Sequence, residues 1–384
     1  MKIEADWIKS HASQVVCQML ASNQHQVFFV GGCVRNALFG APVNDLDIST
    51  DARPETVLFL AKSAGLKAIP TGIEHGTVTV ISDGVPYEIT TFRKDVRTNG
   101  RHAEVTFSNS MVEDAVRRDF TMNALYADPE GTVVDPLDGL PDLQARRVRF
   151  IHDPEKRIQE DYLRILRLFR FHAWYGDPAE GLDADGLAAV AGNVEGLMQV
   201  SKERIGSEML KLLSADNPAP SVAAMQITGV LQAILSGAQC DALSVLIKLE
   251  EDLGIGPDPI RRLAYIGGQN VQEQLRISKT QVRELQVLTK VSRDSVGFAE
   301  AGYRYGHKSG ADILLLRSAL LQQPVETSQL KMIKDAAEQK FPISAVDLMP
   351  EYSGAALGAK LDALEHLWIG SGFTLSKRDL LARL

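Results

Sequence analysis

Four residues near the N-terminus could together handle a phosphate-bearing substrate. Gly31 and Gly32 follow a short apolar run, and adjacent glycines leave backbone N–H groups accessible to a phosphate. Asp45 and Asp47 follow in a segment of alternating apolar and polar residues, and positions i and i+2 of a strand face the same side. Two carboxylates on one face suit hard cations such as Mg²⁺, which activate an attacking hydroxyl and stabilise leaving pyrophosphate. The alternative is a pair of solvated surface carboxylates.

A third acid is common in such sites, and Glu88 is the nearest candidate. It lies in the β-rich run YEITTF, residues 87–92. An exposed glutamate on a strand is the alternative interpretation. With Asp45 and Asp47, Glu88 completes the predicted catalytic set.

The segment RRDFTMNA, residues 117–124, pairs two arginines with an acid. A planar guanidinium donates two hydrogen bonds to a phosphate, which makes Arg118 a candidate nucleotide ligand. The structural alternative is the start of a helix, with Asp119 or Thr121 near its cap.

The segment EDYLRILRLFRF, residues 160–171, has the apolar spacing of a helix. Arg164, Arg167 and Arg170 fall on the face opposite its apolar residues, and Asp161 lies one turn before Arg164. A solvated charged face is the usual meaning of such a pattern. However, residues 146–170 hold eight Lys/Arg and four Asp/Glu in a chain of net charge −8. This local excess predicts a polyanionic partner.

The elements that must position these residues change type at about residue 141. Before it, residues 4–23 have the spacing of an amphipathic helix, 26–30 and 46–48 that of strands, and 77–92 that of a hairpin. After it, strand patterns almost vanish and helical spacing dominates. The fold class predicted is therefore α+β: a small mixed-sheet head followed by an all-helical remainder.

Composition excludes several classes of protein. The chain has 384 residues, 45% of them hydrophobic, which is ample for one or more globular domains. Its negative charge argues against a polybasic nucleic-acid binder but leaves room for a local basic site. No apolar run is long enough for a bilayer and no signal-peptide pattern is present, so no membrane association is expected. Three widely separated cysteines favour a reducing cytoplasm as the location.

Together, the three motifs resemble those of bacterial class II tRNA nucleotidyltransferases, the CCA-adding enzymes of the polymerase-beta-like superfamily. The first, GGCVRNALFGAPVNDLDIST, matches GGxVRDxLLGxxxxDxDxxT of that family; the others match RRDFTxNA and EDxxR. EHGTVTV (74–80) and DPLDGLPDLQARRVR (135–149) are also similar to family segments. The resemblance is strong over residues 27–175 and looser beyond them.

The resemblance implies a set of roles and partners. Asp45 and Asp47 would hold Mg²⁺, Gly32, Arg35 and Arg118 would contact the incoming nucleotide, and Asp161 and Arg164 would read its base as a protein template. Arg167 and Arg170 would support the phosphates or orient that pair. The substrates would be tRNA, CTP and ATP, with no obligate protein partner evident. Residues 95–104 match the position of the flexible loop of the family, although a solvated hairpin tip is an equal alternative.

The resemblance also implies four parts: a nucleotidyltransferase head (1–145), a nucleotide-selecting neck (146–210), a body (211–290) and a tRNA-binding tail (291–384). One departure is Asn36, where the family usually has Asp, which weakens any electrostatic role of that position. Alternative activities with the same motifs are a poly(A) polymerase, or a partial CC-adding or A-adding enzyme. A non-catalytic RNA-binding descendant would not need two metal ligands. In the C-terminal part, Arg261-Arg262 and Lys377-Arg378 are expected to be solvated surface charges, with phosphate contacts as the alternative.

Overall fold

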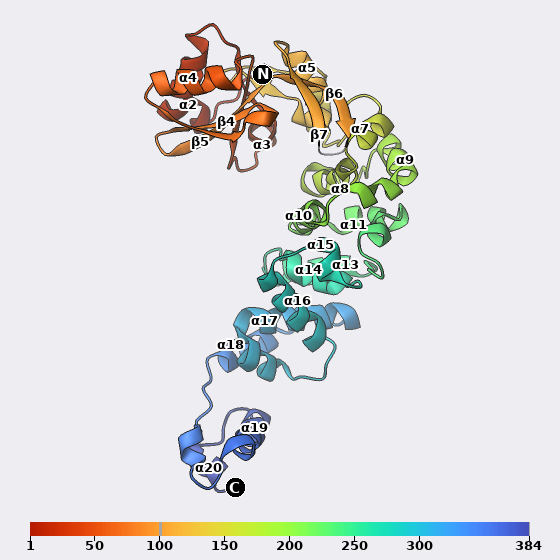
Figure 1. The fold of residues 1–384 in the computed structure, drawn as a ribbon. Helices are drawn as coiled ribbons and strands as arrows, with labels where there is room; N and C mark the ends of the chain where they lie inside the picture. Colours follow the sequence, from red (N-terminus) through yellow and green to blue (C-terminus); the bar gives the residue numbers. More distant parts are fainter. Residues whose placement is uncertain (100–101, 384) are drawn as a thin grey trace. The chain divides into compact units, whose positions relative to one another are not determined.

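The structure is a computed structural model that describes residues 1–99 and 102–383. Its elements are labelled along the chain in Figure 1, and the chain divides into two compact units. The N-terminal unit comprises residues 1–212 and 220–234, and the C-terminal unit comprises 213–219 and 235–384. The predicted α+β head followed by helices is confirmed, whereas the four-part division into head, neck, body and tail stays a prediction.

A mixed sheet of seven strands forms the core of the head, in the order β3-β4-β5-β2-β1-β8-β9. The pair β2–β5 is parallel and the other neighbours are antiparallel. A separate hairpin consists of β6 and β7. The strands are β1 (Val27–Val30), β2 (Leu46–Thr50), β3 (Lys67–Gly72), β4 (Thr77–Ser82), β5 (Val85–Thr91), β6 (Arg93–Asn99), β7 (His102–Phe107), β8 (Tyr126–Ala127) and β9 (Val133–Val134).

Local sequence accounts for the predicted hairpin between β4 and β5. Buried and partly exposed residues alternate along β4, as expected for a strand with one face in the core. Asp83 and Gly84 between the strands have φ of 49° and 79°, the conformation that tight two-residue hairpin turns require. The predicted loop at 95–104 falls on β6 and β7, and its residues 100–101 lie outside the described residues.

Helices surround the sheet and continue beyond it in the N-terminal unit. They are α1 (Asp6–Lys9), α2 (His11–Ala21), α3 (Gly32–Phe39), α4 (Pro54–Ser63), α5 (Met111–Val116), α6 (Gly139–Gln144), α7 (Pro154–Glu160), α8 (Leu163–Tyr175), α9 (Ala184–Gly192), α10 (Lys202–Leu213), α11 (Ala219–Ile227) and α12 (Val230–Ile234), with 3-10 turns η1 (Ile73–His75), η2 (Thr121–Asn123) and η3 (Val194–Gln199). The single helix predicted over 4–23 is two helices, because Ser10 has an extended backbone and caps α2 by accepting a hydrogen bond from Ser13 N at 3.2 Å.

Helix α8 packs its apolar side into the core of the N-terminal unit. Ile165, Leu168 and Phe169 are completely buried. Further along the helix, Phe171 packs against Phe120, with ring centroids 5.1 Å apart. This contact joins α8 to the RRDFTMNA segment, so the second and third sequence motifs are held together by an aromatic core.

The described residues of the C-terminal unit form helices joined by loops, without a strand. Its helices are α13 (Leu243–Asp252), α14 (Pro259–Ile266), α15 (Val271–Leu275), α16 (Lys279–Val291), α17 (Phe298–Leu321), α18 (Thr327–Ala337), α19 (Gly354–Gly370) and α20 (Lys377–Leu381), with the 3-10 turn η4 (Ala345–Leu348). A small core around Trp368 holds α19 and α20 together. Among the described residues, no helix is both long and apolar enough to cross a membrane.

Candidate active site

Three predicted carboxylates lie on or beside two neighbouring parallel strands of the sheet. Asp47 on β2 is the register partner of Glu88 on β5, and Asp45 lies two residues before Asp47, just ahead of the strand. Asp47 is half-buried, whereas Asp45 and Glu88 are exposed. Burial, reinforced by the negative charges of Glu88 and Asp45, raises the pKa of Asp47 to about 6.

This arrangement fits a divalent metal ion. Carboxylate oxygens are the ligands that hard cations prefer. The burial and the like-charge repulsion that raise the pKa of Asp47 both disfavour its ionised form, and a bound cation would offset them. Asp45 and Asp47 are the predicted ligands, and Glu88 lies beside them on the neighbouring strand. Arg118 and Arg35 lie near enough to lower the pKa of Asp47 in part, so positive charge already faces these acids.

The two predicted glycines connect β1 to α3. Gly31 has φ of 70°, a conformation that favours glycine, and an ideal Cβ there would lie 3.3 Å from Nη1 of Arg118. The glycine therefore lets the guanidinium approach the backbone closely. The next residue, Cys33, is buried, and its Sγ donates toward the carbonyl oxygen of Asp47 at 3.8 Å. Burial raises the pKa of this thiol to about 11, so it is not a nucleophile.

Arg118 is held by a buried acid that sequence reasoning did not single out. Its Nη2 lies 3.1 Å from Oδ2 of Asp114, and Arg117 contacts the other oxygen of Asp114 at 2.7 Å. Tyr126 donates to Oδ2 of Asp114 at 2.9 Å. Burial alone would raise the pKa of Asp114, but the charges of Arg118 and Arg117 outweigh it and lower the pKa to about 2. Asp114 thus fixes both arginines of the second motif.

Arg35, on α3 of the head, is held by contacts with both the head and α8. Its Nη2 donates to the Tyr175 hydroxyl at 2.8 Å, and its guanidinium carbon lies 4.1 Å from the Tyr175 ring centroid. Nη1 donates to Oδ1 of Asn123. Asn36 accepts from Arg35 Nη2 at 2.8 Å and donates its own amide to the Pro42 carbonyl at 2.8 Å. The asparagine therefore keeps a structural role, and its donor bond to Pro42 is one that an ionised aspartate could not make.

Asp119 connects the second motif to α8. Its Oδ1 accepts from Phe120 N and from Asn123 Nδ2, at 2.8 and 2.9 Å. Its Oδ2 accepts from Arg167 Nε at 2.6 Å and from Nη2 at 2.5 Å. Burial opposes its ionisation, but Arg167, Asn123 and Arg164 hold the pKa of Asp119 well below its usual range. Asp119 therefore positions Arg167. The structural alternative, a helix capped by Asp119 or Thr121, is not what forms here, because η2 follows Phe120 and has no side-chain cap.

Asp161 and Arg164 each have a partner that the sequence motif does not contain. Asp161 pairs with Arg204 of α10, at 2.6 Å between Oδ2 and Nη2. Arg164 donates through Nη1 to Glu160 at 2.6 Å and through Nη2 to the Arg117 carbonyl at 3.0 Å. Glu160 belongs to the same sequence motif as Arg164 and lies four residues before it. Arg204 lies 43 residues from Asp161, and no local pattern identifies it.

These side chains line a cavity of about 380 Å³, within the range of small-ligand sites. Six arginines and three aspartates give it a net positive charge. The lining residues are Gly31, Gly32, Arg35, Asp47, Arg117, Arg118, Asp119, Asn123, Asp161, Leu163, Arg164, Arg167, Phe171 and Arg204. Asp45, Glu88 and Arg170 are not among them.

The basic segment 146–170 differs from the open positive surface that its composition suggests. Arg170 lies 2.5 Å from Glu208, Arg149 lies 2.8 Å from Asp142, and Arg157 pairs with Glu160. Acids from inside and outside the segment therefore pair with part of this charge. Arg164 and Arg167 line the cavity, whereas Arg146, Arg147 and Lys156 are exposed elsewhere.

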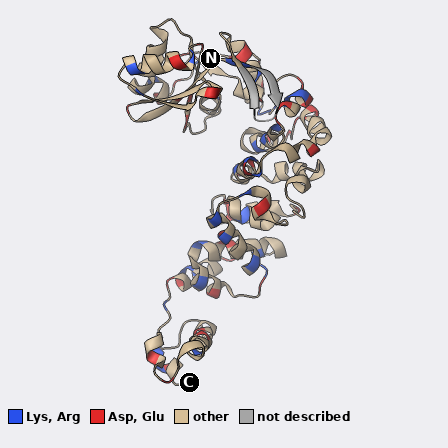
Figure 2. Cartoon of the chain, in the orientation of Figure 1, with Lys and Arg blue, Asp and Glu red and all other residues tan. Residues whose placement is uncertain are grey.

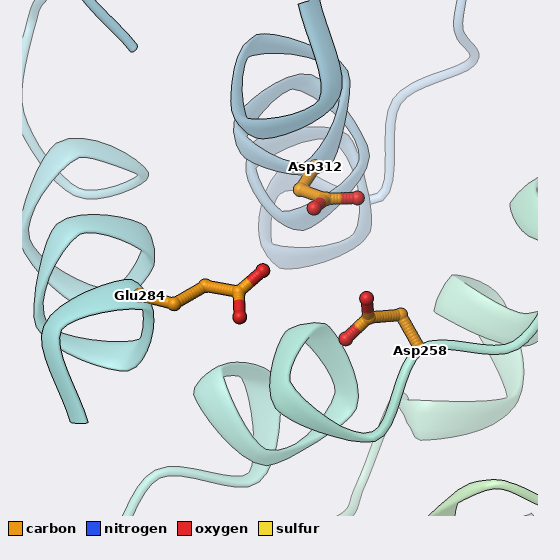
Figure 3. A group of neighbouring side chains, drawn as sticks. All are labelled: Asp258, Glu284 and Asp312. Carbon is orange, nitrogen blue, oxygen red and sulfur yellow. The ribbon is translucent and has the colours of Figure 1, made fainter. Parts of the chain in front are cut away.

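A second acid cluster lies in the C-terminal unit. Asp258, Glu284 and Asp312 direct their carboxylates toward one another (Figure 3), with ligand atoms within 4.8 Å, the only such group of three in the described part of the chain. Lys308 Nζ contacts all three at 2.8, 2.6 and 3.2 Å, so an ammonium group already occupies the place of a cation.

The expectation of surface charge at Arg261-Arg262 is wrong. Both side chains are buried, and they pair with the same buried Glu250 at 2.7 and 2.6 Å. Arg262 also donates to the carbonyl oxygen of Leu213 at 2.7 Å. These arginines stabilise the interior of the C-terminal unit.

Comparison with known proteins agrees with this geometry. Residues 27–149 match the family model of the poly A polymerase head domain, and residues 182–240 match a probable RNA and SrmB-binding site of polymerase A. The chain is 32% identical to the mitochondrial CCA tRNA nucleotidyltransferase 1 of Mus musculus, over 95% of this chain and 88% of that protein. It is 41% identical to the CCA-adding enzyme of Lacticaseibacillus paracasei, over 50% of this chain and 46% of that protein.

Solved structures give the same result for the fold. The CCA-adding enzyme of Bacillus stearothermophilus in complex with CTP aligns with a TM-score of 0.75 and 26% identity, covering 94% of this chain and 92% of that one. The Thermotoga maritima CCA-adding enzyme complexed with tRNA aligns with a TM-score of 0.68 and 17% identity, covering 96% and 93%. The fold and the site therefore define a metal-dependent nucleotidyltransferase of the poly(A) polymerase superfamily. Within it, the chain belongs to the CCA tRNA nucleotidyltransferase family.

Proposed function

We propose that this protein adds C, C and A to the 3′ end of tRNA from CTP and ATP, without a nucleic-acid template and with Mg²⁺ as the metal ion. The observation that carries the proposal is one cavity in which Asp47, Arg118 and the pair Asp161 and Arg164 converge. Asp47 would bind the metal, Arg118 would provide positive charge for the phosphates, and Asp161 and Arg164 would provide hydrogen-bonding groups for a base.

Asp45 and Asp47 would hold the metal, with Glu88 beside them. The metal would supply activation of the terminal hydroxyl of the RNA and stabilisation of the leaving pyrophosphate. Arg118 and Arg35 would bind and orient the nucleotide. Arg35 is in place for this because Tyr175, Asn123 and Asn36 each hold its guanidinium.

The base would be selected by the hydrogen-bonding capacity that remains on the two template residues. An ionised carboxylate has about four acceptor positions, and Asp161 uses three of them, for Leu163 N and two nitrogens of Arg204. Arg164 uses three of its five N–H donors. The remaining acceptor and donors complement an exocyclic amine next to a ring nitrogen acceptor, as in cytosine and adenine. Uracil and guanine present a carbonyl in place of that amine, which faces carboxylate repulsion.

Arg167 would provide charge for the phosphates or orient the template pair, because Asp119 holds it at the cavity wall. Arg170 is a weaker candidate for direct contact. Its guanidinium is paired with Glu208 and stacks 4.3 Å from the Phe171 ring centroid, so its proposed role is to orient Phe171.

The experiment is nucleotide addition to defined RNA ends. tRNA transcripts ending before the CCA, after one C, and after both are incubated with CTP, ATP, GTP or UTP singly and together, with Mg²⁺. Completion of CCA and no further addition, on tRNA only, is expected: three nucleotides on the first transcript, two on the second and one on the third. Arrest after two C residues would indicate a CC-adding enzyme. Addition of A alone, and only to ends that already carry both C residues, would indicate an A-adding enzyme. Long A tails on unrelated RNA would indicate a poly(A) polymerase.

The same assay tests the metal. EDTA should stop the addition, and Mg²⁺ should restore it. Restoration by Mn²⁺ but not by Mg²⁺ would contradict the assignment of Mg²⁺.

A further inference from the structure

The solvent-facing side of α16 in the C-terminal unit carries a row of cations. With about 100° between successive helical residues, Arg283 and Lys290 lie about 40° and 20° around the helix axis from Lys279. All three side chains are exposed. The opposite side of the helix is buried through Leu285 and Leu288. We call Lys279, Arg283 and Lys290 the basic face of α16; basic residues are drawn in blue in Figure 2.

No acid neutralises this row. Within the described residues, none of the three cations of the basic face has an ion pair. The one acid of α16, Glu284, points to the other side and is bound by Lys308 at 2.6 Å. Residues 276–293 hold five Lys/Arg and one Asp/Glu, whereas residues 235–384 as a whole hold 18 of each. The excess is therefore a local feature of this helix.

A groove adjoins the basic face. It has a volume of about 880 Å³ and lies between α16 and the α14–α15 connection. Lys290, Gln286 and Thr289 of α16 line it, together with Arg293. Two acids, Glu273 and Asp294, also line the groove and equal its two cations in number. The excess of positive charge therefore lies on the basic face and not in the groove. The amide and hydroxyl side chains offer hydrogen bonds to sugar or phosphate oxygens beside that face.

We propose that the basic face of α16 contacts the phosphate backbone of tRNA. The inference rests on the proposed function for the identity of the RNA. At 1.5 Å per residue, Lys279 and Lys290 are about 16 Å apart along the helix, which is long enough to reach several successive phosphates of one RNA strand. Exposed cations without protein partners are complementary to such a polyanion, and phosphate contacts carry no base specificity. The surface would therefore serve every tRNA alike.

The test is the salt dependence of tRNA binding. In the variant Lys279→Gln/Arg283→Gln/Lys290→Gln the charges are removed but the helix propensity is kept. Each lost phosphate contact lowers the slope of log Kd against log salt by about 0.7–0.9, so the slope should fall by about 2–3. The Kd for tRNA at ~0.1 M salt should rise at least tenfold. KM for tRNA should rise with it, while KM for CTP and kcat at saturating tRNA stay unchanged.

A matched control removes the same charge elsewhere in the C-terminal unit. Lys331, Lys334 and Lys340 are also exposed, and none of them has an ion pair within the described residues, but Asp335 and Glu338 lie among them in the sequence. These residues lie in the part predicted to be the tRNA-binding tail, but Asp335 and Glu338 offset most of their charge, so the triple Lys→Gln variant of this set should lower the slope much less than the α16 variant.

The outcomes separate this inference from the proposed function. If the wild-type protein does not elongate tRNA, the proposed function fails. If it elongates tRNA and the α16 variant has the same slope and KM as the α18 control, the basic face is not an RNA contact. A charge-keeping variant, Lys279→Arg/Arg283→Lys/Lys290→Arg, should retain the wild-type slope; a loss equal to that of the Gln variant would overturn an electrostatic role.

Discussion

Replacing Asp47 with asparagine should stop nucleotide transfer yet stabilise the metal-free protein. The carboxylate is half-buried beside Glu88 and near Asp45, and its side chain accepts no hydrogen bond within the described residues. Removing its charge therefore relieves repulsion and burial cost without breaking a contact. A residue that only stabilised the fold would behave in the opposite way.

The magnitude follows from the pKa of Asp47, which is raised from 3.8 to about 6. At 1.36 kcal/mol per unit, the ionised group destabilises the fold by about 3 kcal/mol at most. Partial hydration reduces this to roughly 1–2 kcal/mol, or on the order of 4 °C in unfolding midpoint for a unit of this size. Because the folded-state pKa lies above the unfolded one, the cost is absent below about pH 4, grows from about pH 4 to 6, and is constant above it.

The assay is thermal unfolding followed by far-UV circular dichroism, in EDTA and in Mg²⁺, at pH 8 and at pH 4. In EDTA at pH 8, Asp47→Asn should unfold at a higher temperature than wild type, and the difference should vanish at pH 4. Mg²⁺ should raise the midpoint of wild type but not of the variant. Asp45→Asn, at an exposed position, is the control and should change the EDTA midpoint less. A lower midpoint for Asp47→Asn in EDTA at pH 8 would refute the reasoning.

Three further predictions concern the charged partners of the cavity. In Asp119→Asn, the new amide NH₂ would face either Arg167 or the N–H donors of Phe120 and Asn123, all of which need an acceptor. We therefore expect the free energy of unfolding to fall by about 2–3 kcal/mol and the KM for CTP to rise at least tenfold. Unchanged unfolding and an unchanged KM would contradict this. Asp114→Asn should lower the unfolding midpoint at pH 7, because the pKa of Asp114 is lowered to about 2 and its ionised form stabilises the fold. That difference should shrink as the pH falls from about 4 to 2, and a constant difference would show that the charge is not responsible. Arg204→Gln should lower the preference for CTP over UTP about tenfold in kcat/KM with little loss of stability, because its ion pair is partly exposed; unaltered preference would exclude a role in base selection.

Local sequence patterns identified much of the head. The strand predicted over 26–30 is found at Val27–Val30, and the hairpin predicted over 77–92 turns at Asp83 and Gly84. These features depend on neighbours within a few residues, which is why they can be read from one sequence. The placement of Asp47 beside Glu88 is different, since it needed the parallel pairing of β2 with β5.

What the sequence by itself determined is the set of chemical groups: the glycine pair, the acids at 45 and 47, and the arginines of the other two motifs. Which of those charges are available was decided by tertiary structure. Arg170 is paired with Glu208, Asp161 with Arg204, and the Arg261-Arg262 pair lies buried on Glu250. Periodicity fixes the direction of a side chain on its own helix, but its partner comes from another helix, and only the packing of the chain brings the two together. Within the described residues, the same packing leaves Lys279, Arg283 and Lys290 of α16 without an ion pair.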